Sequence, residues 1–412
     1  MRLSSMQQFN QGVNGMLNNQ EMVNRTQQQI SSGRSILTPA DDPIASTRIL
    51  QLQQDIALRE QYASNLISAK NHQNHEEVTL DGVIENLQKI RDLTIQAGNG
   101  STTQDDRGFI AAEIDERIKS IVDLLNTKDA SNVYIFAGYK GEVKPFEERA
   151  GGGYSFEGDQ GQRALQISAN ASVNVNDSGE ELFVNIPSVN NTFFTLDNPE
   201  NIGTGVINVG YIQDQDELDS LYPEDFYIEF NSDNAVTPPS TNYTVRRASD
   251  DRAVDGLSTI AYSVGSDINF AGIAVKVSGQ PEPGDTFLVR SSEKQSVTDT
   301  VQMLVEGLRG FDDSVAGGDK INNLVATTLS NIDSTIAKIS TVQSEIGARL
   351  NSIESVDNFQ QDLELVSQEA LSTLQDLDFA EAVSRLSLES FLLEASQQTY
   401  NKISGLSLFN LI

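Results

Sequence analysis

Residues 30–46 read ISSGRSILTPADDPIAS and separate two segments that have the apolar spacing of amphipathic helices. Gly33 suits the position just after a helix, where the backbone often turns left-handed. Pro39 and Pro43 cannot lie inside a helix, because proline lacks an amide proton and clashes with the preceding turn. Asp42 followed by Pro43 has the pattern of an N-cap and a first helical residue. The stretch therefore predicts that one helix ends before Gly33 and that a second begins beside Pro43.

The segment before this turn has apolar residues at alternating steps of three and four, which is the spacing of a coiled-coil seam. Glutamine interrupts the seam twice, at positions 20 and 27. Its apolar positions are Met6, Phe9, Val13, Met16, Val23 and Ile30. A helix with so little apolar surface is marginal by itself.

After the turn, the second predicted helix runs from near Ile44 to about Gly98, and residues 99–102 separate it from a third. The later half of the second helix and the third helix each carry one apolar stripe. These stripes consist of Leu80, Val83, Leu87, Ile90, Thr94 and Ala97, and of Ile114, Ile118, Ile121 and Leu125.

The C-terminal part repeats the heptad spacing over a longer distance. A stripe runs from Leu329 through Ile353 to Ala370, and Asp376 and Asp378 then mark a break. The last predicted helix carries Leu386 and Leu393. The chain ends in LSLFNLI, whose exposed apolar side chains would favour aggregation, so we expect this end to dock on a partner surface.

An intramolecular helical bundle is the ordinary interpretation of such stripes, and we favour it for the inner helices. The two terminal segments are weaker, and we expect them to pair with each other or with other chains. The predicted interface residues are Met6, Phe9, Val13, Met16, Val23, Ile30, Leu386, Leu393, Leu406, Leu408 and Phe409.

The middle of the chain has the composition of β-structure. It contains 19 of the 27 Phe and Tyr residues, between Tyr134 and Phe311, and most of the prolines. Aromatic residues favour strands and proline marks turns. Alternating apolar residues at 268–277, a turn at Pro281–Gly284 and a return at 286–290 predict a β-hairpin. The acidic run DQDELD at residues 214–219 lacks the spacing of a calcium loop and is interpreted as a solvated loop.

These patterns predict an α+β fold in which long terminal helices form a coiled-coil-like rod around an inserted β-rich centre. The predicted domains are residues 1–45 with 378–412, a terminal helical assembly domain; residues 46–184 with 301–377, a helical rod with a β-hairpin region; and residues 185–300, an outer β-rich domain. Residues 141–311 carry 10 Lys and Arg against 27 Asp and Glu, so we expect this part to face water.

The composition excludes several functions. The 412 residues carry a formal net charge of -31, which disfavours binding to nucleic acid or to an anionic membrane. Cysteine is absent, so disulfides and thiolate metal sites are excluded. The N-terminus has no continuous apolar stretch, so we expect no cleaved signal peptide, and no 20-residue apolar run predicts a membrane helix.

No catalytic set is visible, so we predict a protein that is not an enzyme and needs no cofactor. His72 and His75 are the two histidines, and no further Cys or His completes a zinc site. We therefore expect both on a solvated helix face, with no metal. Neither a phosphate-binding glycine loop nor a GxSxG nucleophile motif is present.

Several terminal motifs resemble those of the flagellin family of bacterial axial proteins. Residues 30–46 are similar to the family's first interhelical turn, with Gly33, Arg34, Asp41 and Asp42 in place. LQKIRDLTIQAGNG at 87–100 and QDLDFAEAVSRLSLES at 375–390 resemble two further family motifs. Together the similar regions cover about residues 1–145 and 312–412.

Other stretches differ from flagellin itself and resemble the family's hook-filament junction proteins. They are VYIFAGYKGEVKPFE, SGQPEPGDTFLV and the ending KISGLSLFNLI. The resemblance implies a structural adaptor of the flagellum that assembles through its terminal helices. Its implied partners are the other hook-associated junction protein, flagellin, the filament cap during assembly, an export chaperone at the C-terminal helix and further copies of itself in a ring. It also implies type III export to an extracellular place at the hook-filament junction.

Two alternatives remain open at this point. The chain could be a flagellin, the filament subunit itself, which belongs to the same structural class. An enzyme carried in the central insertion is the other class, and no motif supports it.

Overall fold

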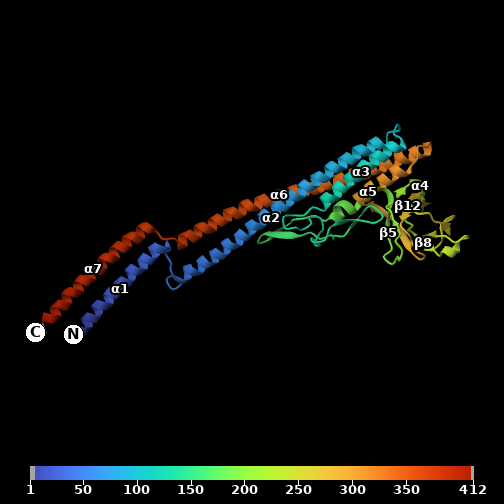
Figure 1. Ribbon diagram of the computed structural model, residues 1–412. Coiled ribbons are helices and arrows are strands. Elements are labelled where there is room, and N and C mark those ends of the chain that lie inside the picture. Colours follow the sequence, from blue (N-terminus) through green and yellow to red (C-terminus); the bar gives the residue numbers. More distant parts are fainter. Residues whose placement is uncertain (1–4, 410–412) are drawn as a thin grey trace. The chain divides into compact units, whose positions relative to one another are not determined.

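The computed structural model describes residues 5–409, with all side chains in that range except those of residues 5, 6, 8, 9, 315, 316 and 403–409. It confirms the α+β class, with long helices at both ends of the chain and a β-rich centre (Figure 1). The α-helices are α1 (Ser5–Ser32), α2 (Pro43–Ala97), α3 (Gln104–Leu125), α4 (Gln215–Leu221), α5 (Val297–Gly310), α6 (Val315–Gln375) and α7 (Phe379–Phe409).

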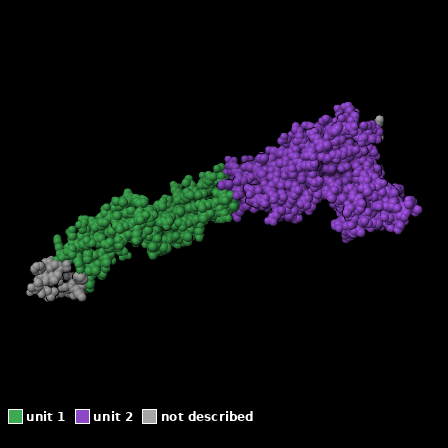
Figure 2. Space-filling model, viewed as in Figure 1, with its two compact units in different colours: residues 1–65, 355–412 green, residues 66–354 purple. Residues whose placement is uncertain are grey.

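The chain forms two compact units (Figure 2). Unit 1 contains residues 1–65 and 355–412, and unit 2 contains residues 66–354. Helices α2 and α6 each contribute to both units. The division into three domains stays a prediction.

The helical bundle of unit 2 has the core that the heptad spacing predicts. The two stripes predicted on α2 and α3 are buried, each residue at most 2% exposed. They pack with Ile332, Ile339 and Ile346 of α6 in one apolar cluster. Burying one such side chain stabilises the fold by about 1.5–3 kcal/mol. The inner helices therefore form an intramolecular bundle, as expected.

Helix α5 is a member of this bundle that the sequence analysis did not predict. Ser296 caps its first turn by accepting a hydrogen bond from the Asp299 amide at 2.9 Å. Its apolar face contributes Val301, Leu304 and Leu308 to the core. The spacing is helical but extends over only 14 residues directly after a strand, so it was missed.

The strands form two small two-stranded sheets and two larger ones. Their bounds are β1 (Phe146–Glu148), β2 (Tyr154–Phe156), β3 (Ala164–Ser168), β4 (Ala171–Asn174), β5 (Ile186–Asp197), β6 (Val206–Ile207), β7 (Tyr211–Ile212), β8 (Phe226–Asn231), β9 (Asn242–Arg247), β10 (Ile260–Ala261), β11 (Asp267–Phe270), β12 (Ile273–Ser278) and β13 (Thr286–Gln295). A five-stranded sheet has the order β10-β9-β8-β13-β5, and a four-stranded sheet joins β11, β12, β6 and β7. Both larger sheets contribute to a second apolar core, separate from that of the bundle. Short helical turns at Glu180–Val184 and Asp233–Ala235 complete the centre.

The predicted hairpin across Pro281–Gly284 is wrong. Strand β12 pairs with β11, whereas β13 pairs with β5 and β8, so the 281–284 connection passes from one sheet to the other. The hairpin turn is at Ala271 and Gly272, which have φ angles of 50° and 73°. Two successive residues with positive φ make the tight turn that a two-residue hairpin needs.

The acidic run at 214–219 is also not a loop, because residues 215–221 form α4. Asp214 is its N-cap and accepts hydrogen bonds from the amides of Asp216 and Glu217. Carboxylates in a first turn are stabilised by the amide groups that the helix leaves unpaired.

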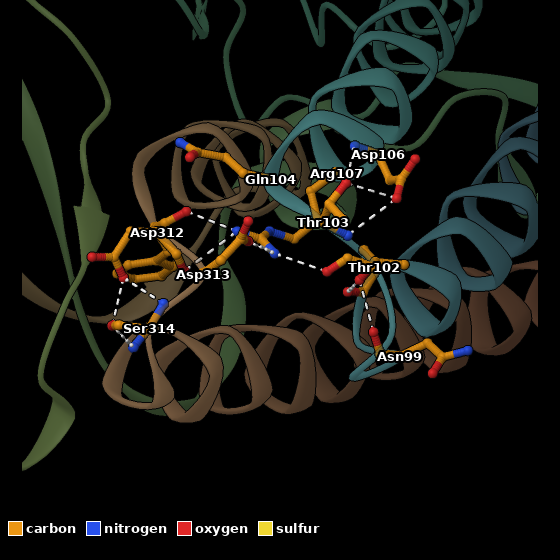
Figure 3. Close-up of polar contacts among 12 residues, drawn as sticks. Asn99, Thr102, Thr103, Gln104, Asp106, Arg107, Asp312, Asp313 and Ser314 are labelled. Atoms are coloured by element: carbon orange, nitrogen blue, oxygen red, sulfur yellow. Dashed lines mark hydrogen bonds and ion pairs between the residues drawn. The ribbon is translucent and has the colours of Figure 1, made fainter.

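A buried arginine connects two turns at one end of the helical bundle (Figure 3). Arg107 of α3 is 3% exposed, and its guanidinium donates to the carbonyls of Thr102 at 3.2 Å and Phe311 at 2.8 Å. It also pairs with Asp313 at 3.0 Å. The α2–α3 turn and the α5–α6 connection are thereby held to one side chain.

Replacing Arg107 with Met should destabilise unit 2 by about 2–3 kcal/mol, because buried carbonyls lose their donors. Urea unfolding followed by circular dichroism measures this loss. The control is Arg117→Met, since Arg117 is 41% exposed and 3.9 Å from Glu113, and such pairs contribute at most about 0.5 kcal/mol. Equal losses in the two variants would show that Arg107 does not connect the turns.

Candidate assembly interface

Helices α1 and α7 lie side by side in unit 1 (Figure 1). Their contact includes two side-chain hydrogen bonds. Asn19 donates to the Ser396 hydroxyl at 2.6 Å, and Arg385 donates to the Gln29 side chain at 3.1 Å. Asn19 and Gln29 of α1 thus take part in hydrogen bonds between the two helices.

Backbone hydrogen bonds join the helix breaks that precede α2 and α7. The amide of Leu377 donates to Gly33 at 3.0 Å, and the amide of Ser35 donates to Gln375 at 2.8 Å. Gly33 has a φ of 68°, as the predicted helix end requires. A side chain at this position would strain the backbone, because left-handed conformations disfavour a Cβ atom.

Asp41 and Asp42, in the turn between α1 and α2, have different roles. Asp42 caps α2, as predicted, by accepting from the amides of Ile44 and Ala45. Asp41 accepts from the amides of Leu37 and Thr38 and pairs with Arg25 at 2.8 Å. The hydrogen bond from Thr38 is the largest cause that lowers the pKa of Asp41, so the turn favours its ionised form.

The sequence predicted eleven interface residues, and the structure places six of their side chains. Val23 is buried, and the others are partly buried: Val13, Met16, Ile30, Leu386 and Leu393. The side chains of Met6, Phe9, Leu406, Leu408 and Phe409 lie outside the described residues. The assignment of all eleven to an interface stays a prediction.

Unit 1 buries few apolar side chains and exposes many. Among its described side chains, four hydrophobic residues are buried: Val23, Tyr62, Leu377 and Ala382. Thirteen large hydrophobic residues are exposed: Leu17, Met22, Ile44, Leu50, Leu58, Phe359, Leu365, Val366, Phe379, Val383, Leu388, Phe391 and Leu392. Exposed apolar surface at this density is typical of interaction sites.

The sequence analysis missed the outer face of α7, which consists of Leu388, Phe391 and Leu392. These side chains are 59%, 65% and 42% exposed, whereas Leu386 and Leu393 are partly buried. The predicted heptad stripe includes Leu386 and Leu393 but none of these three exposed residues. A helix with apolar residues on several faces is one that neighbours surround, and this signal was present in the sequence.

The parts of α2 and α6 within unit 1 are held by a polar network. Arg59 donates to Asp55 at 2.9 Å and to the Gln360 side chain at 3.0 Å. Asp55 also accepts from the Ser367 hydroxyl at 2.9 Å. The hydrogen bond from Arg59 is the largest cause that lowers the pKa of Asp55. Polar contacts thus help to position these helices, and several of their apolar residues remain exposed.

The histidines do not lie on a solvated face, contrary to expectation. Both are partly buried. His72 is 3.7 Å from Asp129, and His75 is 3.3 Å from the Lys128 carbonyl. Within residues 5–409, no group of three potential metal ligands occurs. None of the helices in this described range has the length and hydropathy needed to span a membrane.

Two family models match the helical parts of the chain. The bacterial flagellin N-terminal helical region matches residues 4–141, and the C-terminal helical region matches residues 329–412, together more than half of the sequence. The chain belongs to the flagellin family. The matched segments contain all eleven predicted interface residues and the outer face of α7.

Within the flagellin family, the chain is similar to hook-associated proteins. Flagellar hook-associated protein 3 of Escherichia coli (strain K12) is 25% identical, over 100% of this chain and 99% of that protein. The crystal structure of hook-associated protein 3 from Legionella pneumophila is 28% identical with a TM-score of 0.53, and covers 79% of this chain and 98% of that chain. FlgL from Xanthomonas campestris, 24% identical with a TM-score of 0.51 over 78% of this chain and 99% of that chain, shows the same fold.

Limited proteolysis of the monomer should cut residues 5–65 and 355–402 before the helices of unit 2. Segments with few buried apolar contacts open at a low free-energy cost and are cleaved first. Mass spectrometry of the fragments over time measures the order. Cleavage within α3 as early as within α1 would contradict the assignment of unit 1 as weakly stabilised.

Proposed function

We propose that this flagellin-family protein is a structural adaptor that joins the hook side of the bacterial flagellum to the flagellin filament through its terminal helices. One observation carries the proposal: among its described side chains, unit 1 exposes thirteen large apolar residues and buries four hydrophobic ones. Burial of each in an assembly would contribute about 1.5–3 kcal/mol. The full-length similarity to hook-associated protein 3 supports the junction over the filament itself, so a flagellin is the weaker alternative.

The partners follow from this position. One is the other hook-associated junction protein on the hook side, and the next is flagellin on the filament side. Further copies of this chain would complete a ring, and the filament cap would contact it during assembly. We also propose that an export chaperone covers α7 inside the cell, and that the working location is extracellular. The protein would act without catalysis, cofactor or metal.

Two surfaces of unit 1 would have separate tasks. The partly buried residues Leu386 and Leu393, with Val13, Met16, Val23 and Ile30 of α1, would hold the two helices together. The outer face of α7 would contact neighbouring subunits. Met6, Phe9, Leu406, Leu408 and Phe409 would extend the assembly interface.

Changing Leu388, Phe391 and Leu392 together to Ser should leave the monomer folded but prevent the junction from forming. These side chains are exposed, so their loss costs the monomer little, whereas an assembly loses apolar burial. Cells would shed flagellin into the medium and lose motility. Quantifying the variant in the medium separates failed assembly from failed export through a chaperone.

The matched control is Phe109→Ser, because Phe109 of α3 is 74% exposed but lies in unit 2. Cells that carry Phe109→Ser should remain motile. Motile cells that export the triple variant and keep their filaments would contradict the assignment of the outer face. Immunogold labelling at the hook end, rather than along the filament, tests the adaptor against the flagellin alternative.

We also propose the three-domain division of the sequence analysis, with residues 185–300 as an outer domain that can be separated from the rest. The apolar core of the two larger sheets supports this, because all its buried residues except Met303 of α5 lie between 193 and 289. Tyr211 and Ala274 also pack with Phe311, Ile321 and Val325, so some contact with the helices would be lost. Ile186 and Val297 pack in the bundle core, so a test deletion has to retain them.

Replacing residues 192–292 with a Gly-Ser linker should leave the helical bundle folded, because its core residues remain. The measurements are the helical circular dichroism signal per molecule and the thermal midpoint. The control replaces residues 110–125 of α3, which supply core residues and should abolish cooperative unfolding. Loss of the helical signal in the first variant would contradict an outer domain.

A further inference from the structure

A buried polar cluster lies where residues 162–178, which include β3 and β4, meet α2 and α6 in unit 2. Glu76 of α2 is 1% exposed, and its Oε1 accepts from the Asp177 amide at 3.0 Å. Arg349 of α6 donates to both oxygens of the Asp177 carboxylate, at 2.7 and 3.0 Å. Gln73 donates to the Asn174 carbonyl at 3.0 Å. The segment is therefore attached to the bundle by charged and polar groups.

Five atoms of this cluster are shielded from solvent without a hydrogen-bond partner among the described residues. Two are acceptors: Gln73 Oε1 and Glu76 Oε2. Three are donors: Nε and Nη2 of Arg163 and Nδ2 of Asn176. Buried polar atoms without partners cost free energy, so their protonation and positions decide how firmly the segment is held.

Gln73 and Glu76 are one turn apart on the buried face of α2. A carboxylate at Glu76 leaves two acceptors on this face, which cannot bond to each other. A neutral carboxylic acid carries a proton and can donate it to an acceptor such as an amide oxygen. Protonation would therefore supply a donor on a face that otherwise presents two acceptors without partners.

The charges around Glu76 come from every element packed on it. Residues 162–178 supply Asp177 and Arg163, α6 supplies Arg349 with its partner Glu345, and α2 carries His72, which pairs with Asp129. Burial, and next the Asp177 charge, raise the pKa of Glu76 to about 8, although the hydrogen bond from the Asp177 amide, Arg349 and Arg163 lower it. The neutral form is thus favoured around neutral pH.

We propose that Glu76 is a pH-sensitive latch that attaches residues 162–178 to the helical bundle. As a neutral acid it bonds to Gln73 and the Asp177 amide. As a carboxylate it loses the bond to Gln73 and is repelled by the Asp177 carboxylate of the segment, and the segment loosens.

The direction of the pH dependence follows from the two pKa values. The pKa of Glu76 is about 8 in the folded protein, against 4.5 when it is exposed to water. The closed segment therefore binds more protons than the opened one between these values. Attachment is strongest below pH 4.5, weakens as the pH rises to about 8 and is constant above it.

Hydrogen–deuterium exchange of residues 165–177 in the full chain tests the latch. The comparison is wild type against Glu76→Gln, which keeps the neutral donor at every pH. The segment is identical in both proteins, so their exchange ratio cancels the intrinsic rates. The ratio of opening constants should rise by up to about tenfold per pH unit between pH 5.5 and 7.5, and level off above pH 8. Glu85→Gln, an exposed change on the same helix, should follow wild type.

A second variant tests the role of Arg163. Its charge favours the carboxylate, so Arg163→Gln should move the plateau of the ratio to higher pH. A ratio that stays constant from pH 5.5 to 8.5 would overturn the latch. A plateau that Arg163→Gln leaves in place would overturn the effect of the Arg163 charge on Glu76.

Discussion

Two backbone hydrogen bonds between residues 33–35 and 375–377 hold together the helix breaks that precede α2 and α7. Because these hydrogen bonds place the two breaks side by side, α1 and α7 also lie next to each other. The contact between the two helices combines polar side chains, such as Asn19 with Ser396, with apolar residues such as the buried Val23. Many other apolar residues of unit 1 stay exposed. On the proposed function, burial of this exposed surface in an assembly would supply the stabilisation that unit 1 lacks by itself.

Unit 2, in contrast, has two large apolar cores of its own. Its bundle buries aliphatic side chains from four helices, and its sheets bury a second, aromatic-rich core. Polar side chains connect different elements of unit 2 by hydrogen bonds and ion pairs. Arg107 reaches carbonyl and carboxylate partners through its terminal nitrogens, although its Nε has no partner among the described residues. Arg163 and Glu76 also retain buried atoms without partners, and of these groups the Glu76 carboxyl can change its hydrogen-bonding role by protonation.

The errors of the sequence analysis have physical reasons. The β12–β13 hairpin failed because alternating apolar residues show that a strand exists, but not which strand it pairs with. The charges of residues 214–219 favour a solvated loop in the sequence, but Asp214 is the N-cap of α4. For the assembly interface, the heptad stripe identified Leu386 and Leu393, which are partly buried. The exposed residues Leu388 and Phe391 lie off that stripe.

The sequence by itself determined the family, the helix boundaries at Gly33 and Pro43, and the apolar stripes of the bundle. These depend on local backbone chemistry and on periodicity, which act between residues close in the chain. Only the tertiary structure decided which strands pair, that α1 lies along α7, and that Glu76 meets Asp177 and Arg349. Such contacts join residues far apart in sequence, and their energies depend on burial and geometry that no local pattern encodes.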